Sequence, residues 1–182
     1  MATTHVRVVE DDVERRPDAS GSLTTAGILL GLGFGGFVDG IVMHQVLQWH
    51  HMGTDHGDHA SFPRTTVSSL EDNTLWDGIF HGATWIISLV GLYMLWRVLR
   101  DGHRTTWLSL TGLLLVGWGI FNVVEGLVNH QLLGIHHVRD DIGSPLSWDI
   151  AFLIFGAALI VVGSAMRRAD LRQAQHRLHV PD

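Results

Sequence analysis

The feature that most constrains this chain is a set of four long stretches that are almost free of charge. They cover residues 23–49, 75–99, 107–133 and 147–166, and each holds at most two charged side chains. A helix of about 20 apolar residues crosses a hydrocarbon core about 30 Å thick. Buried helices of a soluble protein would instead each need a polar face. The pattern therefore predicts an all-α membrane protein, with four transmembrane helices arranged as a four-helix bundle.

The composition separates this chain from several classes of protein. Hydrophobic residues make up 46% of the sequence and charged residues 16%, whereas soluble domains hold about 25% charged residues. The chain has no cysteine, which excludes disulfide scaffolds, thiolate metal clusters and a thiol nucleophile. A net charge of -6 argues against nucleic acid as a partner. The expected surroundings are a lipid bilayer.

The arginines are unevenly distributed around the four stretches. Three lie beside the short connection between the second and third stretch, and four follow the fourth stretch. These arginines are Arg97, Arg100, Arg104, Arg167, Arg168, Arg172 and Arg177. The other two connections carry one arginine each. Because positively charged flanks stay in the cytoplasm, we expect both termini to be cytoplasmic.

The polar ends of the chain predict tails outside the membrane domain. Residues 1–22 are polar and acidic, which is typical of a disordered segment. Residues 23–168 are expected to form the transmembrane domain, and residues 169–182 a cytoplasmic C-terminal tail.

The two halves of the sequence repeat each other. Residues 39–52 align with residues 125–138 without a gap, at an offset of 86, and match in an acid, a glycine, a His-Gln pair and a His-His pair. Gly31 and Gly33 fall on Gly117 and Gly119 at the same offset. The pattern Trp-Asp-x-x-Phe opens both the second and the fourth stretch. We interpret the chain as a tandem repeat of a two-helix hairpin, with the two copies parallel in the membrane.

The repeat places ionisable residues at one depth. Seven are expected near the outward ends of the four helices: Asp39, His44, Asp77, His81, Glu125, His130 and Asp149. Such groups in a bilayer each cost about 2.5–3.5 kcal/mol unless they are paired, hydrated or coordinating. Their shared depth therefore indicates a ligand or a polar network.

Helical spacing suggests which of these residues share a face. Asp77 and His81 are four residues apart. If the helices continue that far, His44 shares a face with His51, and His130 with His137. A second stripe would join Asp39, Met43 and His50, and its counterpart would join Glu125, Asn129 and His136.

These residue types predict an outward-facing transition-metal site. Imidazole suits copper, zinc and iron, and carboxylates either ligate the metal or fix the tautomer of a liganding histidine. Copper is favoured because of the outer location and the nearby Met43 and Met52; zinc and iron use the same donors. The candidate ligands are His44, His50, His51, His81, His130, His136, His137, Asp39, Asp77, Glu125 and Asp149.

Two other interpretations of the polar layer remain open at this point. The histidines and carboxylates can form a structural hydrogen-bond network without a metal, or two histidines can ligate a haem b. If a metal is bound, the protein is either a membrane metalloenzyme or redox protein, or a metal-handling factor that captures ions with the loop His56–His59.

Several of these motifs resemble a known family. Residues 33–52, 76–81 and 117–139, together with the pair Trp148-Asp149, are similar to an uncharacterised bacterial family of predicted membrane proteins, domain of unknown function 2243. The resemblance covers residues 23–168. It implies an integral protein of the bacterial plasma membrane, linked to respiratory-oxidase biogenesis. Oxidase assembly components and a second copy of the chain are then the candidate protein partners.

Overall fold

The computed structural model describes residues 19–54 and 66–179, and these form helices and short connections without any strand. Residues 1–18 of the expected tail 1–22, the loop His56–His59 and residues 180–182 lie outside the described residues. Residues 19–22 of that tail belong instead to the first helix. Four helices are long and apolar enough to cross a membrane: Gly21–Val46, Val67–Arg100, Trp107–Leu133 and Leu146–His176. The predicted all-helical fold with four spans is confirmed.

The first and third spans each change helix type near their end. The first consists of the α-helix α2 (Ala19–Phe37) and the π-helix η1 (Val38–Val46). The third consists of α4 (Trp107–Glu125) and the π-helix η2 (Gly126–Leu133). The second span is the single helix α3 (Val67–Arg100), and the fourth is α5 (Leu146–His179), which follows a short 3-10 turn, η3 (Asp140–Ile142).

Some predicted helix ends differ from the observed ones. Helix α3 begins before the predicted residue 75, because Thr66 caps its start by accepting a hydrogen bond from the backbone N–H of Ser69. Helix α5 continues past the predicted residue 166 into a polar segment. The π-helix η1 ends at Val46, so residues 47–49 of the predicted first span are not helical.

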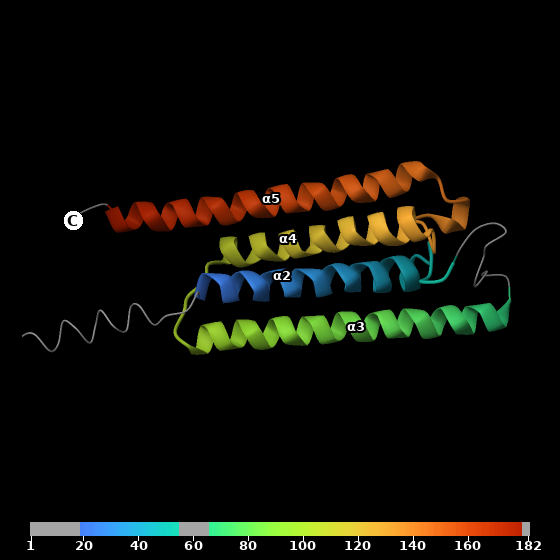
Figure 1. Ribbon diagram of the computed structural model, residues 1–182, viewed down its shortest axis with the longest axis horizontal. Helices are drawn as coiled ribbons and strands as arrows, with labels where there is room; N and C mark the ends of the chain where they lie inside the picture. Colours follow the sequence, from blue (N-terminus) through green and yellow to red (C-terminus); the bar gives the residue numbers. More distant parts are fainter. Residues whose placement is uncertain (1–18, 55–65, 180–182) are drawn as a thin grey trace, which may run out of the picture.

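The four helices lie side by side in one row, in the order α3, α2, α4, α5 (Figure 1). Within the described residues, α3 packs on α2, α2 on α4, and α4 on α5, while the two outer helices do not touch each other. The predicted four-helix bundle thus has the form of an open row. A row is stable in lipid because apolar side chains on both broad faces can contact acyl chains directly.

Glycines bring the two central helices into backbone contact. A Cβ atom at Gly31 in α2 would lie 2.8 Å from the Cα of Gly117 in α4, and the reverse distance is the same. Any larger side chain would force the helices apart. Gly33 and Gly119 instead face the outer helices: Gly33 approaches Ser88 of α3, and Gly119 approaches Gly156 of α5. The row thus depends on small residues at each contact.

Candidate metal centre

Both π-helices place an acid and a histidine on the same side of a span. Asp39 and His44 in the first span are five residues apart, as are Glu125 and His130 in the third. In an α-helix, residues at this spacing point about 140° apart. A π-helix pairs residue i with residue i+5, which brings them together. The change of helix type therefore creates two acid–histidine pairs.

The first pair becomes a group of three when the chain folds back. After η1 ends, Trp49 donates its backbone N–H to the carbonyl oxygen of Met43 (2.9 Å), and His50 then lies over the end of the span. The Nε2 atoms of His44 and His50 lie 3.1 Å and 3.7 Å from the carboxylate oxygens of Asp39. All three side chains are buried. Their donor atoms are close enough together to hold one metal ion.

The second group has the same composition at the offset of 86 residues. The Nε2 atoms of His136 and His130 lie 2.7 Å and 3.6 Å from Oε1 of Glu125. The ring centroids of the two histidines are 5.0 Å apart, compared with 4.5 Å for His44 and His50. This group is also buried and can also hold a metal ion.

The two groups form one continuous cluster between α2 and α4. The rings of His50 and His136 stack with a centroid distance of 4.7 Å and an angle of 6° between their planes. His44 lies 6.1 Å from His136, and His50 lies 6.1 Å from His130, again measured between centroids. Two candidate ion positions therefore lie next to each other.

Each copy holds the histidine of the other copy in place. Nδ1 of His50 lies 3.1 Å from the carbonyl oxygen of Val138, and Nδ1 of His136 lies 3.4 Å from that of Met52. Val138 and Met52 are equivalent positions of the repeat. A carbonyl oxygen can only accept, so both Nδ1 atoms carry the proton. This leaves Nε2 as the coordinating atom of each ring.

The outer helices supply one aspartate to each group. Asp77 of α3 accepts from Nδ1 of His44 (3.0 Å) and of His51 (2.7 Å), and also from the backbone N–H of Met52 (2.9 Å). In such an arrangement the carboxylate orients a liganding imidazole from behind. Asp77 is therefore placed to support a ligand, while Nε2 of His44 remains directed at Asp39.

Asp149 of α5 holds the equivalent position in the second copy. It accepts from Nδ1 of His137 (2.6 Å) and from the backbone N–H of Val138 (3.0 Å). Its contact with Nδ1 of His130 is longer, at 3.5 Å. The side chains of His51 and His137 are 15% and 27% exposed, whereas that of His44 is fully buried. The outer histidines thus form the rim of the cluster.

Several ligand atoms of the cluster are buried without a hydrogen bond to any described residue. They are both carboxylate oxygens of Asp39, Oε2 of Glu125, Nε2 of His44 and His50, and both ring nitrogens of His130. In its neutral form, each of His44 and His50 carries its proton on Nδ1 and directs a bare Nε2 lone pair at Asp39. Two electron-rich groups in this position repel each other unless a cation lies between them. The arrangement is typical of a metal site.

His50 and His136 differ in the direction in which their pKa is shifted. Burial lowers the pKa of His50, which favours the neutral form that binds metals. Burial also acts to lower the pKa of His136, but the hydrogen bond to Glu125 and the charges of Glu125 and Asp39 together outweigh it and raise that pKa. A metal ion entering the second group must therefore displace a proton more often than in the first.

The comparisons with known proteins identify the family. A family model described as a predicted membrane protein, domain of unknown function 2243, matches residues 26–170. The chain belongs to this family. The resemblance expected from the motifs is thus confirmed, while the bacterial origin stays a prediction. No curated protein and no solved structure matches the chain.

The structure divides the predicted site residues into three sets. Six lie in the two groups: Asp39, His44, His50, Glu125, His130 and His136. Asp77, Asp149, His51 and His137 surround these groups. His81 belongs to neither set, because its Nε2 lies against Gly40 and has no hydrogen-bond partner. Sharing a face with Asp77 therefore does not bring His81 into the cluster.

The predicted second stripe grouped residues that do lie together, Asp39 with His50 and Glu125 with His136, but α-helical spacing is not what brings them together. Both predicted stripes required α-helical spacing up to residues 50 and 51, and to residues 136 and 137, but η1 ends at Val46 and η2 at Leu133. The histidines of both His-His pairs therefore lie in the connections and not in the helices. Met52 contributes backbone atoms to the site, its carbonyl to His136 and its N–H to Asp77.

Two supporting residues were missed from the sequence. Thr54 accepts from the backbone N–H of His51 (3.0 Å), and Asp140 accepts from that of His137 (3.1 Å). Both are buried, and both close the turn that carries a rim histidine. They are equivalent positions of the repeat, but their side chains differ. Extending the alignment by two residues beyond Met52 and Val138 would have pointed to them.

Proposed function

We propose that this protein binds two transition-metal ions in adjacent sites, one in the group of Asp39, His44 and His50 and one in that of Glu125, His130 and His136. The observation that carries the proposal is the set of buried Nε2 and carboxylate atoms that face one another without hydrogen bonds. A pair of cations would satisfy these atoms and neutralise the buried acids.

The donor set narrows the class of metal. Two imidazoles and one carboxylate per ion occur in zinc enzymes and in non-haem iron enzymes, with further positions open to water or substrate. The same nitrogen donors also bind copper, which stays our prediction from the sequence. Calcium and magnesium are disfavoured because they take oxygen ligands.

The burial of the ligands favours an ion that stays in place. All four imidazoles of the two groups are at most 2% exposed. A resident pair of ions suits a membrane metalloenzyme or redox protein. A metal-handling factor, for example one that serves respiratory-oxidase biogenesis, would exchange its ions readily. The rate at which a chelator removes the bound metal separates these two functions.

The alternatives without such ions fit the geometry less well. A haem b held by two histidines needs the two rings on opposite sides of a flat macrocycle in an apolar slot. Here the rings contact one another at 4.5–6.1 Å with two carboxylates among them. A purely structural network would satisfy its donors and acceptors with hydrogen bonds, and this cluster does not.

Elemental analysis of the full chain, purified without a histidine tag, tests the proposal. Copper, zinc and iron are each supplied separately to metal-free protein, and excess ion is removed. We expect about two ions per chain for the preferred metal. The double variant His44→Ala, His50→Ala should retain about one, and the control His176→Ala, on exposed helix far from the cluster, should retain two.

Two results would overturn the proposal. One is a content well below one ion per chain with all three metals. The other is an equal metal content in the double variant and in the wild type.

A further inference from the structure

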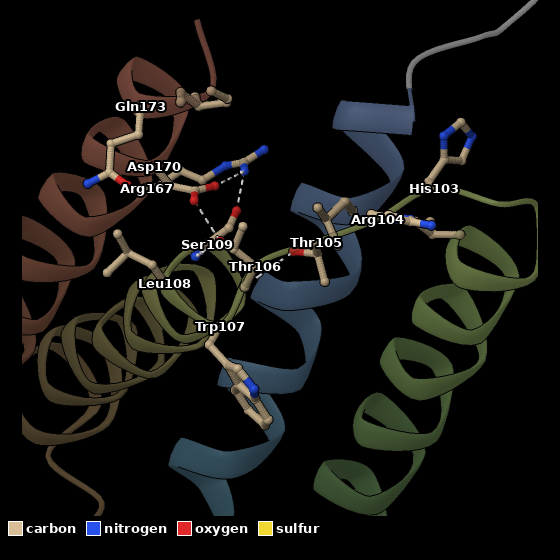
Figure 2. A pocket seen from close by; sticks show the side chains of 14 residues that line it. His103, Arg104, Thr105, Thr106, Trp107, Leu108, Ser109, Arg167, Asp170 and Gln173 are labelled. Carbon is tan, nitrogen blue, oxygen red and sulfur yellow. Dashed lines mark hydrogen bonds and ion pairs between the residues drawn. The ribbon is translucent and has the colours of Figure 1, made fainter. Parts of the chain in front are cut away.

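A second polar site lies at the opposite end of the row from the metal cluster. There, the connection between α3 and α4 and the C-terminal part of α5 enclose a cavity of about 610 Å³. Figure 2 shows Arg167, Asp170, Ser109 and Thr106 gathered on one side of it, with Arg104 and His103 on the connection. The predicted orientation places this end at the cytoplasmic surface.

The cavity carries one net positive charge. Arg104 is exposed and makes no hydrogen bond or ion pair with the described residues. The guanidinium of Arg167 donates to Oγ of Ser109 and lies 3.9 Å from Asp170. Asp170 also accepts from the hydroxyl of Thr106 (2.6 Å). Because Arg167 and Asp170 compensate each other, the charge of Arg104 is left for a ligand.

The start of α4 adds to the positive potential. The side chain of Thr106 accepts a hydrogen bond from the backbone N–H of Ser109, and its carbonyl oxygen accepts one from that of Leu110. Trp107 and Leu108 are the first residues of α4 and line the cavity. The first N–H groups of a helix and its dipole favour anions, phosphate above all. The arginine and the helix start thus favour the same kind of ligand.

Part of the cavity wall is apolar. Leu23, Val98, Leu108 and Leu171 line it, and Trp107, which is 84% exposed, flanks it. An exposed tryptophan at the end of a span is typical of the membrane interface. A ligand here would meet both polar donors and apolar side chains.

We propose that this cavity binds a phosphate group with Arg104 as its principal charged contact, the apolar wall favouring the headgroup of an anionic phospholipid. Basic pockets between spans on the cytoplasmic side suit such headgroups. This site is independent of the proposed metal function, since it shares no residue with the cluster.

Native mass spectrometry of the full chain in detergent tests the proposal. The probes are phosphatidylglycerol, phosphatidylcholine and inorganic phosphate, each titrated separately. We expect one phosphatidylglycerol per chain to be retained at least fivefold more tightly than phosphatidylcholine. The variant Arg104→Gln should weaken this binding about fivefold. The control Arg168→Gln, exposed at the same end but outside the cavity, should not.

A second variant tests the cavity itself. Ala174→Phe adds bulk to the lining and should displace the lipid without changing the charge. If inorganic phosphate binds to the wild type and this binding is lost in Arg104→Gln, the phosphate site is supported. The bound phosphate group would then belong to a soluble ligand and not to a lipid. Equal retention of the two lipids without phosphate binding would overturn the proposal. Equal weakening by Arg104→Gln and Arg168→Gln would also overturn it, because only surface charge would then act.

Discussion

Single residues decide which nitrogen of each histidine is available to a metal. Carbonyl oxygens fix the proton on Nδ1 of His50 and His136, and Asp77 does so for His44. Removing such a partner leaves the ligand present but free to rotate or to change tautomer. The supporting aspartates should therefore matter nearly as much as the ligands themselves.

The variant Asp77→Asn tests this role. An amide oxygen can still accept one hydrogen bond, but its NH2 group cannot accept from the second imidazole. We expect the affinity for metal to fall about 10–100-fold while the helical content stays the same. Competition with a chromogenic chelator measures the affinity. Asp72→Asn, on an exposed part of the same helix, is the matched control. Wild-type affinity in Asp77→Asn would contradict the assigned role.

Each half of the site depends on one residue with a left-handed backbone conformation, shortly after a π-helix. Gln48 has φ 52° and the equivalent Gly134 has φ 57°. These residues turn the chain so that His50 and His136 return over the ends of the spans. Glycine adopts this conformation without strain, and most other residues do not.

Two glycine substitutions should change stability in opposite directions. Neither Gly134 nor Gly78 has another atom within 4 Å of an added Cβ, so only the backbone differs. Gly134→Ala should lower the free energy of unfolding by about 1 kcal/mol, because alanine is strained at positive φ. Gly78→Ala, inside α3, should raise it by up to about 1 kcal/mol. Thermal unfolding in detergent measures both, and a shift of the same sign would be inconsistent with this account.

The contact between α2 and α4 links the packing of the row to the metal cluster. In Gly31→Val, the added Cβ atom alone would lie 2.8 Å from the Cα of Gly117, and the two methyl groups would need further space. We expect a loss of about 1–3 kcal/mol in stability and weaker metal binding, since the two groups lie on these two spans. Gly82→Val, with open space around it, should lower neither the stability nor the metal binding. Metal content and thermal unfolding of the two variants provide the comparison.

For the whole molecule, the flat row determines what the membrane contacts. The outer helices α3 and α5 expose many large apolar side chains, and polar groups gather at the two ends of the row. This arrangement suits a bilayer, whose centre is apolar and whose surfaces are polar. The predicted orientation then assigns the metal cluster to the outer surface and the phosphate cavity to the cytoplasmic one.

The absence of cysteine makes this orientation directly testable. In the variant Ile142→Cys, the exposed connection before α5 carries the only thiol of the chain. A membrane-impermeant maleimide should label it in intact cells. Asp101→Cys, on the exposed connection between α3 and α4, should be labelled only after the cells are permeabilised. The reverse pattern would place the termini outside.

Much of the fold and many residues of the site were determined by the sequence alone. Long apolar stretches must be helices in lipid, because every backbone N–H and C=O group has to be satisfied within the segment. The recurring acid, His-Gln and His-His pattern named all six residues of the two groups in advance. Both inferences rest on local composition and spacing, which can be read along the chain.

Only the tertiary structure decided how these residues are used. The π-helices pair Asp39 with His44, which α-helical spacing did not predict, and the fold-back after each π-helix adds a histidine to the pair. His81 has the right residue type and depth, yet it packs against Gly40. The row order, too, follows from backbone contact at Gly31 and Gly117. Periodicity describes one helix at a time, and these features arise where separate segments meet.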